Sequence, residues 1–442
     1  MKFHQQFPDF TQKRVIDAHM DQLDTHGMSR RDFLALMSAG AAASASAAVL
    51  GIPAVAIADP GGKVAYLQWS ASIGYLNDAA TGAIGACKAL GIDYVGIDAQ
   101  FDMNQQLNQF EQQAAAGTKT ILLHSSDGSA LKREAEIAAQ EQIYFVNVWA
   151  TLPWFTPFET SDYWALYAVP EEFSAHRGAT AELLKKVTEE FGGGEILGVT
   201  GVPGHSTDTI RSRGRDDAFK DYPKCTLVDQ LAGNFGREDS QRAADALLAK
   251  HPNIVGVVAQ NDDSAQGVIA SLRAAGYQPG VDVFVTGADG TNDGVTAIKE
   301  GRQLATSANV PAYLGAMFTM RLYDVSHDWK PRDSERMMYW RSVTMTKDNV
   351  DDYLSRYVNN DGVEPFDYKL MSKVLHPDDW DPQAEMFPMD IDNEWAGTPK
   401  PEGWQYPQAY LDAKANEWAD VAAEYQDHYK IDLFGPSPNK AS

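Results

Sequence analysis

Planar polar side chains follow three predicted strands, at the point where each strand ends. These residues are Asn261, Asp289 and Asn309, which come after strands ending at positions 259, 286 and 308. A carboxylate accepts several hydrogen bonds and an amide both donates and accepts, so such groups can bind neighbouring hydroxyls at the same time. In a parallel sheet, ligands bind outside the carboxyl ends of the strands. The three side chains therefore indicate a pocket that recognises hydroxyl groups.

Aromatic side chains gather near the predicted strand ends of the first half of the chain. They are Trp69, Tyr75, Trp149, Trp154 and Trp164. An aromatic face can stack on the C–H surface of a sugar ring, although packing in the core is the commoner role of any single one. Combined with the amides and carboxylates, the aromatic set favours a sugar or polyol as the ligand.

Sequence signatures of catalysis are missing. The chain has no His-Glu-x-x-His, no Cys-x-x-Cys and no Gly-x-Ser-x-Gly motif. Gly198, Gly201 and Gly204 end a strand, but their spacing differs from that of a dinucleotide-binding loop. We therefore predict no catalytic residue, no cofactor and no metal site.

Short apolar runs alternate with helical patterns along most of the chain, which is typical of βαβ units and parallel sheets. Strands are predicted at 64–69, 94–97, 120–124, 144–149 and 163–169, and in a second series at 195–200, 226–230, 254–259, 283–286 and 304–308. Amphipathic helices are predicted at 105–116, 175–190, 240–250 and 265–275. The two series predict an α/β protein with two flavodoxin-like lobes and a ligand cleft between them.

Composition excludes several classes of protein. The 442 residues include 37 Lys and Arg against 61 Asp and Glu, which gives a net charge of −24. Such a charge repels a phosphate backbone, so nucleic acid is not an expected partner. Cys87 and Cys225 are the two cysteines. They cannot build a disulfide framework, and we interpret both as ordinary buried thiols.

The N-terminal region has the features of an export signal. Arg30 and Arg31 stand directly before a weakly apolar, alanine-rich stretch that ends at Ala58. This arrangement resembles a twin-arginine signal peptide, and Ala56-Ile57-Ala58 has the small-x-small pattern of a cleavage site. We predict a signal peptide at 1–58, a mature chain from Asp59 and a periplasmic location. The alternative is a chance Arg-Arg pair before an alanine-rich helix.

The pattern changes beyond Asp351. The last part of the chain is rich in proline and aromatic residues and shows no βαβ alternation. It contains too many aromatic residues for a flexible linker. We predict an ordered extension packed on a lobe, with one amphipathic helix over 408–430. Its role is either structural or that of a cover over the cleft or the hinge.

Four sequence motifs resemble one known family. They are Arg211 to Pro223, His251 to Ile254, Ala259 to Gly267 and Thr286 to Gly290. In this order they are similar to the ribose-binding type of periplasmic sugar-binding protein, the substrate-binding subunit of ABC importers. The resemblance extends from about Lys63 to Val350. It implies the type I fold of that family, with two lobes joined by three crossovers that close on one sugar-sized ligand.

The resemblance also assigns roles to individual residues. Arg211 matches the family's arginine that donates to sugar oxygens. Asn261 and Asp289 match an asparagine and an aspartate of its binding site. Asn309 falls where the family often has glutamine on the last crossover, and Tyr75 falls where an aromatic residue sandwiches the sugar.

One part of the family pattern is absent. After the fourth strand the family usually has Asp-Arg, both of which bind sugar, whereas this chain reads Val148-Trp149-Ala150. We expect Trp149 to make this half of the pocket more aromatic. His124 and Ser126, at the end of the third strand, are candidate polar contacts, and the alternative is that they are loop residues at the rim of the cleft.

These observations lead to one prediction of organisation and function. The expected domains are the signal peptide at 1–58, a first lobe from 59–163 and 310–340, a second lobe from 164–309 and 341–350, and the extension at 351–442. The expected protein is not an enzyme. It is a monomeric periplasmic receptor that captures a sugar or polyol and delivers it to an ABC permease with its ATPase. The alternatives are an exported enzyme whose site has no sequence motif, or a receptor for chemotaxis or sensor signalling.

Overall fold

The computed structural model describes residues 62–125 and 128–440. The predicted signal peptide and Ser126 lie outside the described residues. The described chain belongs to one compact unit, Pro60–Ser442.

Seven strands of the described chain form the first sheet, in the order β13-β11-β5-β4-β3-β1-β2. All pair in parallel except β13, which runs antiparallel to β11. The strands are β1 (Lys63–Gln68), β2 (Asp93–Asp98), β3 (Thr120–Ser125), β4 (Tyr144–Trp149), β5 (Trp164–Pro170), β11 (Met337–Trp340) and β13 (Met386–Pro388). The helices of this lobe are α3 (Gly74–Leu90), α4 (Met103–Ala115), α5 (Leu131–Glu141) and α11 (Pro311–Ser326).

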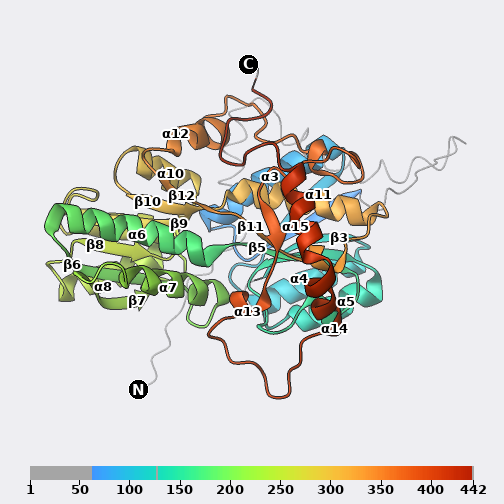
Figure 1. Ribbon diagram of the computed structural model, residues 1–442, viewed down its shortest axis with the longest axis horizontal. Coiled ribbons are helices and arrows are strands. Elements are labelled where there is room, and N and C mark those ends of the chain that lie inside the picture. Colours follow the sequence, from blue (N-terminus) through green and yellow to red (C-terminus); the bar gives the residue numbers. More distant parts are fainter. Residues whose placement is uncertain (1–61, 126–127, 441–442) are drawn as a thin grey trace, which may run out of the picture. The chain divides into compact units, whose positions relative to one another are not determined.

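The second sheet contains six strands of the described chain, in the order β12-β10-β9-β8-β6-β7, with β12 antiparallel at one edge. Its strands are β6 (Gly194–Thr200), β7 (Cys225–Ala232), β8 (Gly256–Ala259), β9 (Phe284–Asp289), β10 (Ala305–Ala308) and β12 (Val343–Thr346). Its helices are α6 (Glu172–Phe191), α7 (Ser206–Phe219), α8 (Arg237–Lys250), α9 (Asp262–Ala274) and α10 (Asn292–Lys299). Figure 1 shows α6, α7 and α8 in shades of green around this sheet.

Both sheets place their first five strands in the order 2-1-3-4-5, the flavodoxin-like arrangement. This confirms the predicted fold class. In the described part of the chain, the polypeptide passes between the sheets after β5, after β10 and after β11, and it passes back to the first sheet after β12, where β13 pairs with β11.

The structure corrects the predicted lobe boundary at 163. Strand β5 pairs with β4 and is buried along its whole length, so it belongs to the first sheet. The turn before it, near Ser161, only connects two neighbouring strands. The first crossover begins after Pro170 instead.

Helices α3 and α11 pack against each other at backbone distance. A Cβ added to Gly82 would lie 1.8 Å from the carbonyl oxygen of Ala312, and one added to Gly315 would lie 1.9 Å from that of Ala79. Only glycine fits such an approach. This contact fixes α11, which follows the second crossover, on the first lobe.

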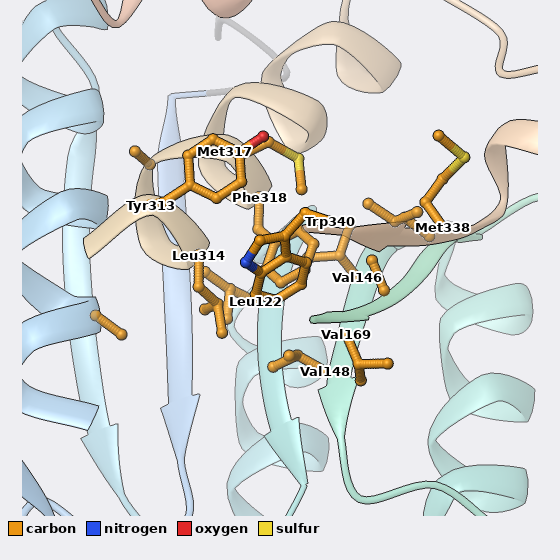
Figure 2. Close-up of a cluster of buried hydrophobic side chains, with 14 of the residues drawn as sticks. Leu122, Val146, Val148, Val169, Tyr313, Leu314, Met317, Phe318, Met338 and Trp340 are labelled. Atoms are coloured by element: carbon orange, nitrogen blue, oxygen red, sulfur yellow. The ribbon is translucent and has the colours of Figure 1, made fainter. Parts of the chain in front are cut away.

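Apolar side chains of α11 fill the space above the first sheet. Figure 2 shows Tyr313, Leu314 and Phe318 of α11 beside Leu122 of β3 and Trp340 of β11. The Trp340 side chain is fully buried, and its Nε1 donates to the carbonyl oxygen of Asn309, 2.9 Å away. The end of β11 is thereby tied to the second crossover.

The extension is ordered and shares the core of the first lobe, with Trp380, Trp395 and Tyr425 buried in the same cluster. It contains α12 (Val350–Tyr353), a π-helical turn (Leu354–Val358), α13 (Ile391–Glu394), α14 (Gln408–Asn416) and α15 (Trp418–His428). The prediction of one helix over 408–430 is wrong, because the helix breaks at Glu417. The Glu417 carboxylate there accepts from the backbone N–H and the hydroxyl of Ser334.

Two further sequence features can be placed. Cys87 and Cys225 are both buried and free. In the described ranges, no helix is long and apolar enough to cross a membrane.

Candidate functional site

A hollow lies between the carboxyl ends of the two sheets. Its volume is about 420 Å³ when the part that opens to solvent is included. Both lobes contribute to its wall. The lining residues are Trp69, Ile73, Tyr75, Leu76, His124 and Trp149 from the first lobe, and His205, Thr207, Arg211, Phe235, Asn261 and Asp289 from the second. Six of the predicted site residues are therefore brought together here.

Arg211 of α7 is the cation of this site and is buried. Its Nη2 donates to Asp289 Oδ1 at 2.6 Å, its Nη1 donates to the carbonyl oxygen of Gln260 at 2.7 Å, and its Nε donates to Glu172. Burial lowers the pKa of Arg211, but Asp289 and Glu172 outweigh burial and raise it. The guanidinium is therefore always charged and is held in one orientation by two carboxylates.

Asp289 is carried by a loop that Asp262 organises. The Asp262 carboxylate accepts from the backbone N–H groups of Gly290 and Thr291, both at 2.9 Å, and from Gln303 at 2.8 Å. The pKa of Asp262 is raised to about 7, chiefly by burial and also by the Asp289 charge, while the hydrogen bonds from Gln303 and Thr291 lower it. Asp262 itself lies behind the wall and positions the aspartate that faces the hollow.

Asn261 caps helix α9 while lining the hollow. Its Oδ1 accepts from the Ser264 N–H at 2.9 Å, and its Nδ2 donates to the carbonyl oxygen of Phe235 at 3.1 Å. Because an amide nitrogen carries two hydrogens, one N–H of Asn261 is left for a ligand.

Asn309 lies behind the wall. It is fully buried, and its Oδ1 accepts from the Tyr75 hydroxyl at 3.1 Å. Asn309 therefore orients the Tyr75 ring, which faces the hollow. The bond joins α3 of the first lobe to the second crossover.

Aromatic rings form two groups around the hollow. In the first lobe, Tyr75 is edge-on to Trp149, with centroids 5.6 Å apart, and edge-on to His124 at 6.1 Å. The second group spans the cleft. Trp69 of the first lobe stacks with His205 of the second lobe, with centroids 6.1 Å apart, and meets Phe235 of the second lobe edge-on at 6.3 Å. Such rings offer flat apolar faces with a few polar edges.

The His124 ring is buried, and burial lowers its pKa to about 3, with a smaller contribution from His205. The ring is therefore neutral at neutral pH. Among the described residues, none forms a hydrogen bond with its buried Nδ1. One nitrogen of a neutral imidazole can donate a hydrogen bond to a hydroxyl, and the other can accept one from a hydroxyl.

The backbone adopts positive φ at the ends of several strands beside the hollow. The values are 66° at Trp149, 60° at Phe235, 104° at Asp289 and 60° at Val310. Bulky and β-branched residues rarely adopt such angles, which cost roughly 1–3 kcal/mol each and cluster at functional sites. The strain turns the side chains of these residues away from the direction that regular strands would give them.

Two predicted aromatic residues do not reach the hollow. Trp154 packs against Trp395 and Trp404 of the extension, at 5.4 and 5.1 Å between centroids. Trp164 is fully buried and stacks on Phe145. Both have the core role that is more common for a single tryptophan.

Sequence reasoning missed Glu172, His205 and Phe235. Glu172 begins α6 directly after the first crossover, and that position was its only signal. His205 and Phe235 follow β6 and β7, so a search of every strand end for aromatic rings would have found them. In the described chain, no cluster of His, Cys, Asp or Glu is able to hold a metal ion.

Comparisons with known proteins agree with this geometry. Residues 64–327, more than half of the chain, match the periplasmic binding protein domain. A ribose import binding protein of Salmonella typhimurium is 28% identical over 227 residues, which cover 51% of this chain and 72% of that protein. A xylitol-binding protein of Mycolicibacterium smegmatis is 27% identical over 319 residues, which cover 71% of this chain and 86% of that protein.

Solved structures share the fold. A twin-arginine translocation pathway signal protein from Burkholderia phytofirmans has a TM-score of 0.64 at 22% identity and covers 67% of this chain and 93% of that one. A periplasmic solute-binding protein from Actinobacillus succinogenes with bound D-allose has a TM-score of 0.58 at 21% identity. The match covers 66% of this chain and 99% of that one. The chain therefore belongs to the periplasmic binding protein family and has its two-lobed type I fold.

Proposed function

We propose that this protein is the substrate-binding subunit of an ABC importer and captures one neutral sugar or polyol between its lobes. The observation that carries the proposal is the wall of the hollow. Arg211, Asp289 and Asn261 present fixed polar groups, while Tyr75 and Trp149 present aromatic faces. This combination suits a molecule with hydroxyls on its edge and C–H groups on its faces.

Charge supports a neutral ligand. The one Arg211 cation is already paired with two carboxylates, Glu172 and Asp289, and the buried His124 ring is neutral. An anionic sugar acid would meet uncompensated negative charge here, which is costly in a buried site. Sugars and polyols without a carboxylate avoid that cost.

The relatives support the same class of ligand. The names of the similar proteins include ribose, D-allose and xylitol, which are all small polyhydroxylated molecules. We infer that this chain binds a molecule of similar size. Which one it binds depends on the aromatic wall around Trp149.

Contacts across the cleft support capture by closure. The Gly74 N–H of the first lobe donates to Asp263 of the second at 2.9 Å, and the Asp78 carboxylate accepts from the backbone and the side chain of Asn292, both at 3.0 Å. A ligand that contacts both lobes stabilises such a closed form. We propose that the closed form is presented to a permease with its ATPase, that the protein acts as a monomer in the periplasm, and that the twin-arginine route exports it.

A ligand screen tests the proposal. The mature chain is heated with pentoses, hexoses, pentitols and inositols, and isothermal titration calorimetry then measures Kd for each one that raises Tm. We expect at least one neutral sugar or polyol to raise Tm, and the corresponding sugar acid to leave it unchanged. A Tm that rises only with acidic sugars, or with no member of the panel, would contradict the proposal.

A further inference from the structure

The extension packs behind the wall of the hollow through residues 391–404, which we call the brace. Its tryptophans Trp395 and Trp404 pack on Trp154, in the loop after β4. Trp404 Nε1 also donates to the carbonyl oxygen of Trp154 at 2.6 Å, and Trp154 Nε1 donates to that of Thr398 at 3.2 Å. The brace therefore holds the loop that continues from the site residue Trp149.

Glu394 is the buried carboxylate of the brace. Its Oε1 accepts from the Tyr167 hydroxyl at 3.0 Å, and its Oε2 accepts from the Tyr339 hydroxyl at 2.9 Å. Tyr167 lies on β5 and Tyr339 on β11, the strands that lead into the first and third crossovers. One side chain of the extension thus ties together two of the strands that lead to the hinge.

Tyr167 links this carboxylate to the site. Its hydroxyl lies 3.0 Å from Glu394 Oε1 and 3.3 Å from the carbonyl oxygen of Trp149. The single hydrogen of a tyrosine hydroxyl is shared between these two acceptors. Trp149 has a φ of 66°, and a residue in that conformation needs its surroundings to hold it. We propose that Glu394 is a positioning residue for sugar binding, because it fixes Tyr167 and thereby the strained Trp149. This inference rests on the proposed function.

The charge state of Glu394 is sensitive to pH near neutrality. Its pKa is raised to about 7, chiefly by burial and also by the nearby Glu172 and Glu171, while the hydrogen bonds from Tyr339 and Tyr167 lower it. These four side chains are the titratable groups that face the carboxyl from β5, β11 and the start of α6. Above pH 7 the carboxylate accepts from both tyrosines. Below pH 7 it is protonated and accepts less well, which loosens Tyr167.

The test compares Glu394→Gln with a control at another buried glutamate. Glu335 also accepts from a tyrosine, Tyr425 at 3.1 Å, and pairs with Lys373, but it makes no contact with the site. Calorimetry measures Kd for D-ribose and for xylitol between pH 6 and pH 8. We expect the parent to bind at least threefold more weakly at pH 6 than at pH 8. Glu394→Gln should show the weaker value at every pH, and Glu335→Gln should keep the parent profile even where its Tm falls.

A second measurement does not depend on sugar binding. The fluorescence of Trp149, taken as the difference between the chain and its Trp149→Phe variant, should titrate near pH 7 in the parent and stay constant in Glu394→Gln. If neither sugar binds the parent, the choice of ligand fails and this titration decides the role of Glu394. An unchanged titration in Glu394→Gln, or the parent's Kd at pH 8 in that variant, would overturn the inference.

Discussion

Arg211 shows how one buried cation organises the site. Its guanidinium contacts two carboxylates and a backbone carbonyl, so it holds α6, α7 and the end of β9 together. Because the guanidinium group is planar and is held in place by these contacts, its remaining N–H groups point in one direction. The packing of the second lobe and the ligand recognition that we propose therefore depend on the same side chain.

Removing that side chain should damage both properties. Arg211→Ala leaves Glu172 and Asp289 as buried carboxylates without a partner, and breaking a buried pair in this way costs about 3–5 kcal/mol of unfolding free energy. The variant should also lose the thermal shift given by the best sugar of the screen. Urea unfolding and calorimetry measure the two effects.

Arg177→Ala is the matched control on the adjacent helix α6. Arg177 pairs with Asp217 at 2.8 Å and with Asp221, and all three side chains are partly exposed. Exposed pairs contribute little, so this variant should stay within about 1 kcal/mol of the parent and keep its affinity. Equal losses in the two arginine variants would contradict the role given to Arg211.

His124 should make the protein less stable in acid. Its pKa is about 3 in the folded chain, below the ordinary value near 6.5. The unfolded chain therefore binds a proton that the folded chain excludes, and the free energy of unfolding falls as pH decreases from about 6.5 to about 3. The slope from this residue approaches 1.4 kcal/mol per pH unit.

The variant His124→Phe removes that proton uptake. We expect it to lose less unfolding free energy than the parent between pH 7 and pH 4.5, when both are unfolded in urea. The difference isolates His124 from other titrating groups, such as the buried His176. Parallel losses in the two proteins would show that His124 is protonated in the fold.

At the level of elements, α3 and α11 approach each other at backbone distance. This contact keeps Tyr75, on the first turn of α3, within hydrogen-bond distance of Asn309 on the second crossover. The contact is made of backbone, so even one added methyl group forces the helices apart.

Gly82→Ala should therefore cost more than a helix substitution usually does. Alanine favours a helix, yet its Cβ would meet the Ala312 carbonyl at 1.8 Å. Overpacking of this kind costs about 1–3 kcal/mol. Gly236→Ala is the control, since its Cβ would lie 3.9 Å from the nearest atom, the carbonyl oxygen of Gly233. Urea unfolding should separate the two variants, and a Gly82→Ala protein as stable as the control would contradict this packing.

The elements of both lobes could be predicted from the sequence because their apolar runs are short and well separated. The runs at 120–124 and 144–149, for example, are observed as β3 and β4 within one residue. Errors arose where the pattern did not show tertiary contacts. The helix break at Glu417 depends on Ser334, which is distant in the chain, and the assignment of β5 to the first sheet depends on its pairing with β4.

Among the site residues, the strand-end rule located Asn261, Asp289 and Trp149, whereas Arg211 came from the family resemblance, and His205 and Phe235 were missed. The rule also selected Asn309, whose amide points to Tyr75 instead of the hollow. Nothing local distinguishes these cases, because burial of an amide is decided by the neighbouring lobe. Glu394 could not be found from the sequence at all, since its role comes from contacts with β5 and β11.

At the level of the whole molecule, the Asp78 side chain of α3 meets Asn292 at the start of α10, a contact between the lobes that the closure we propose would make. The pKa of Asp78 is raised to about 6, chiefly by burial and also by Asp263 and Asp293, while the Asn292 backbone N–H lowers it. Opening exposes Asp78 to water and returns its pKa towards the ordinary value of about 3.9. The closed form therefore binds the proton more tightly, and a fall in pH from 7 to 5 favours closure.

Small-angle scattering of the protein without sugar measures this effect. The radius of gyration should be smaller at pH 5 than at pH 8, and the variant Asp78→Asn should reduce the difference. The charges that face Asp78 include Arg237, which pairs with Asp263 and Asp293 and stays in place in that variant. An unchanged pH dependence in Asp78→Asn would assign the effect to other groups.

Strand β13 gives the chain an unusual order of assembly. The first lobe starts with β1 at Lys63 and is completed only when Met386–Pro388 pairs with β11. The second lobe takes its five parallel strands from one uninterrupted stretch, 194–308. Since a ribosome releases the N-terminal part first, the lobe that is synthesised first is the last to be finished.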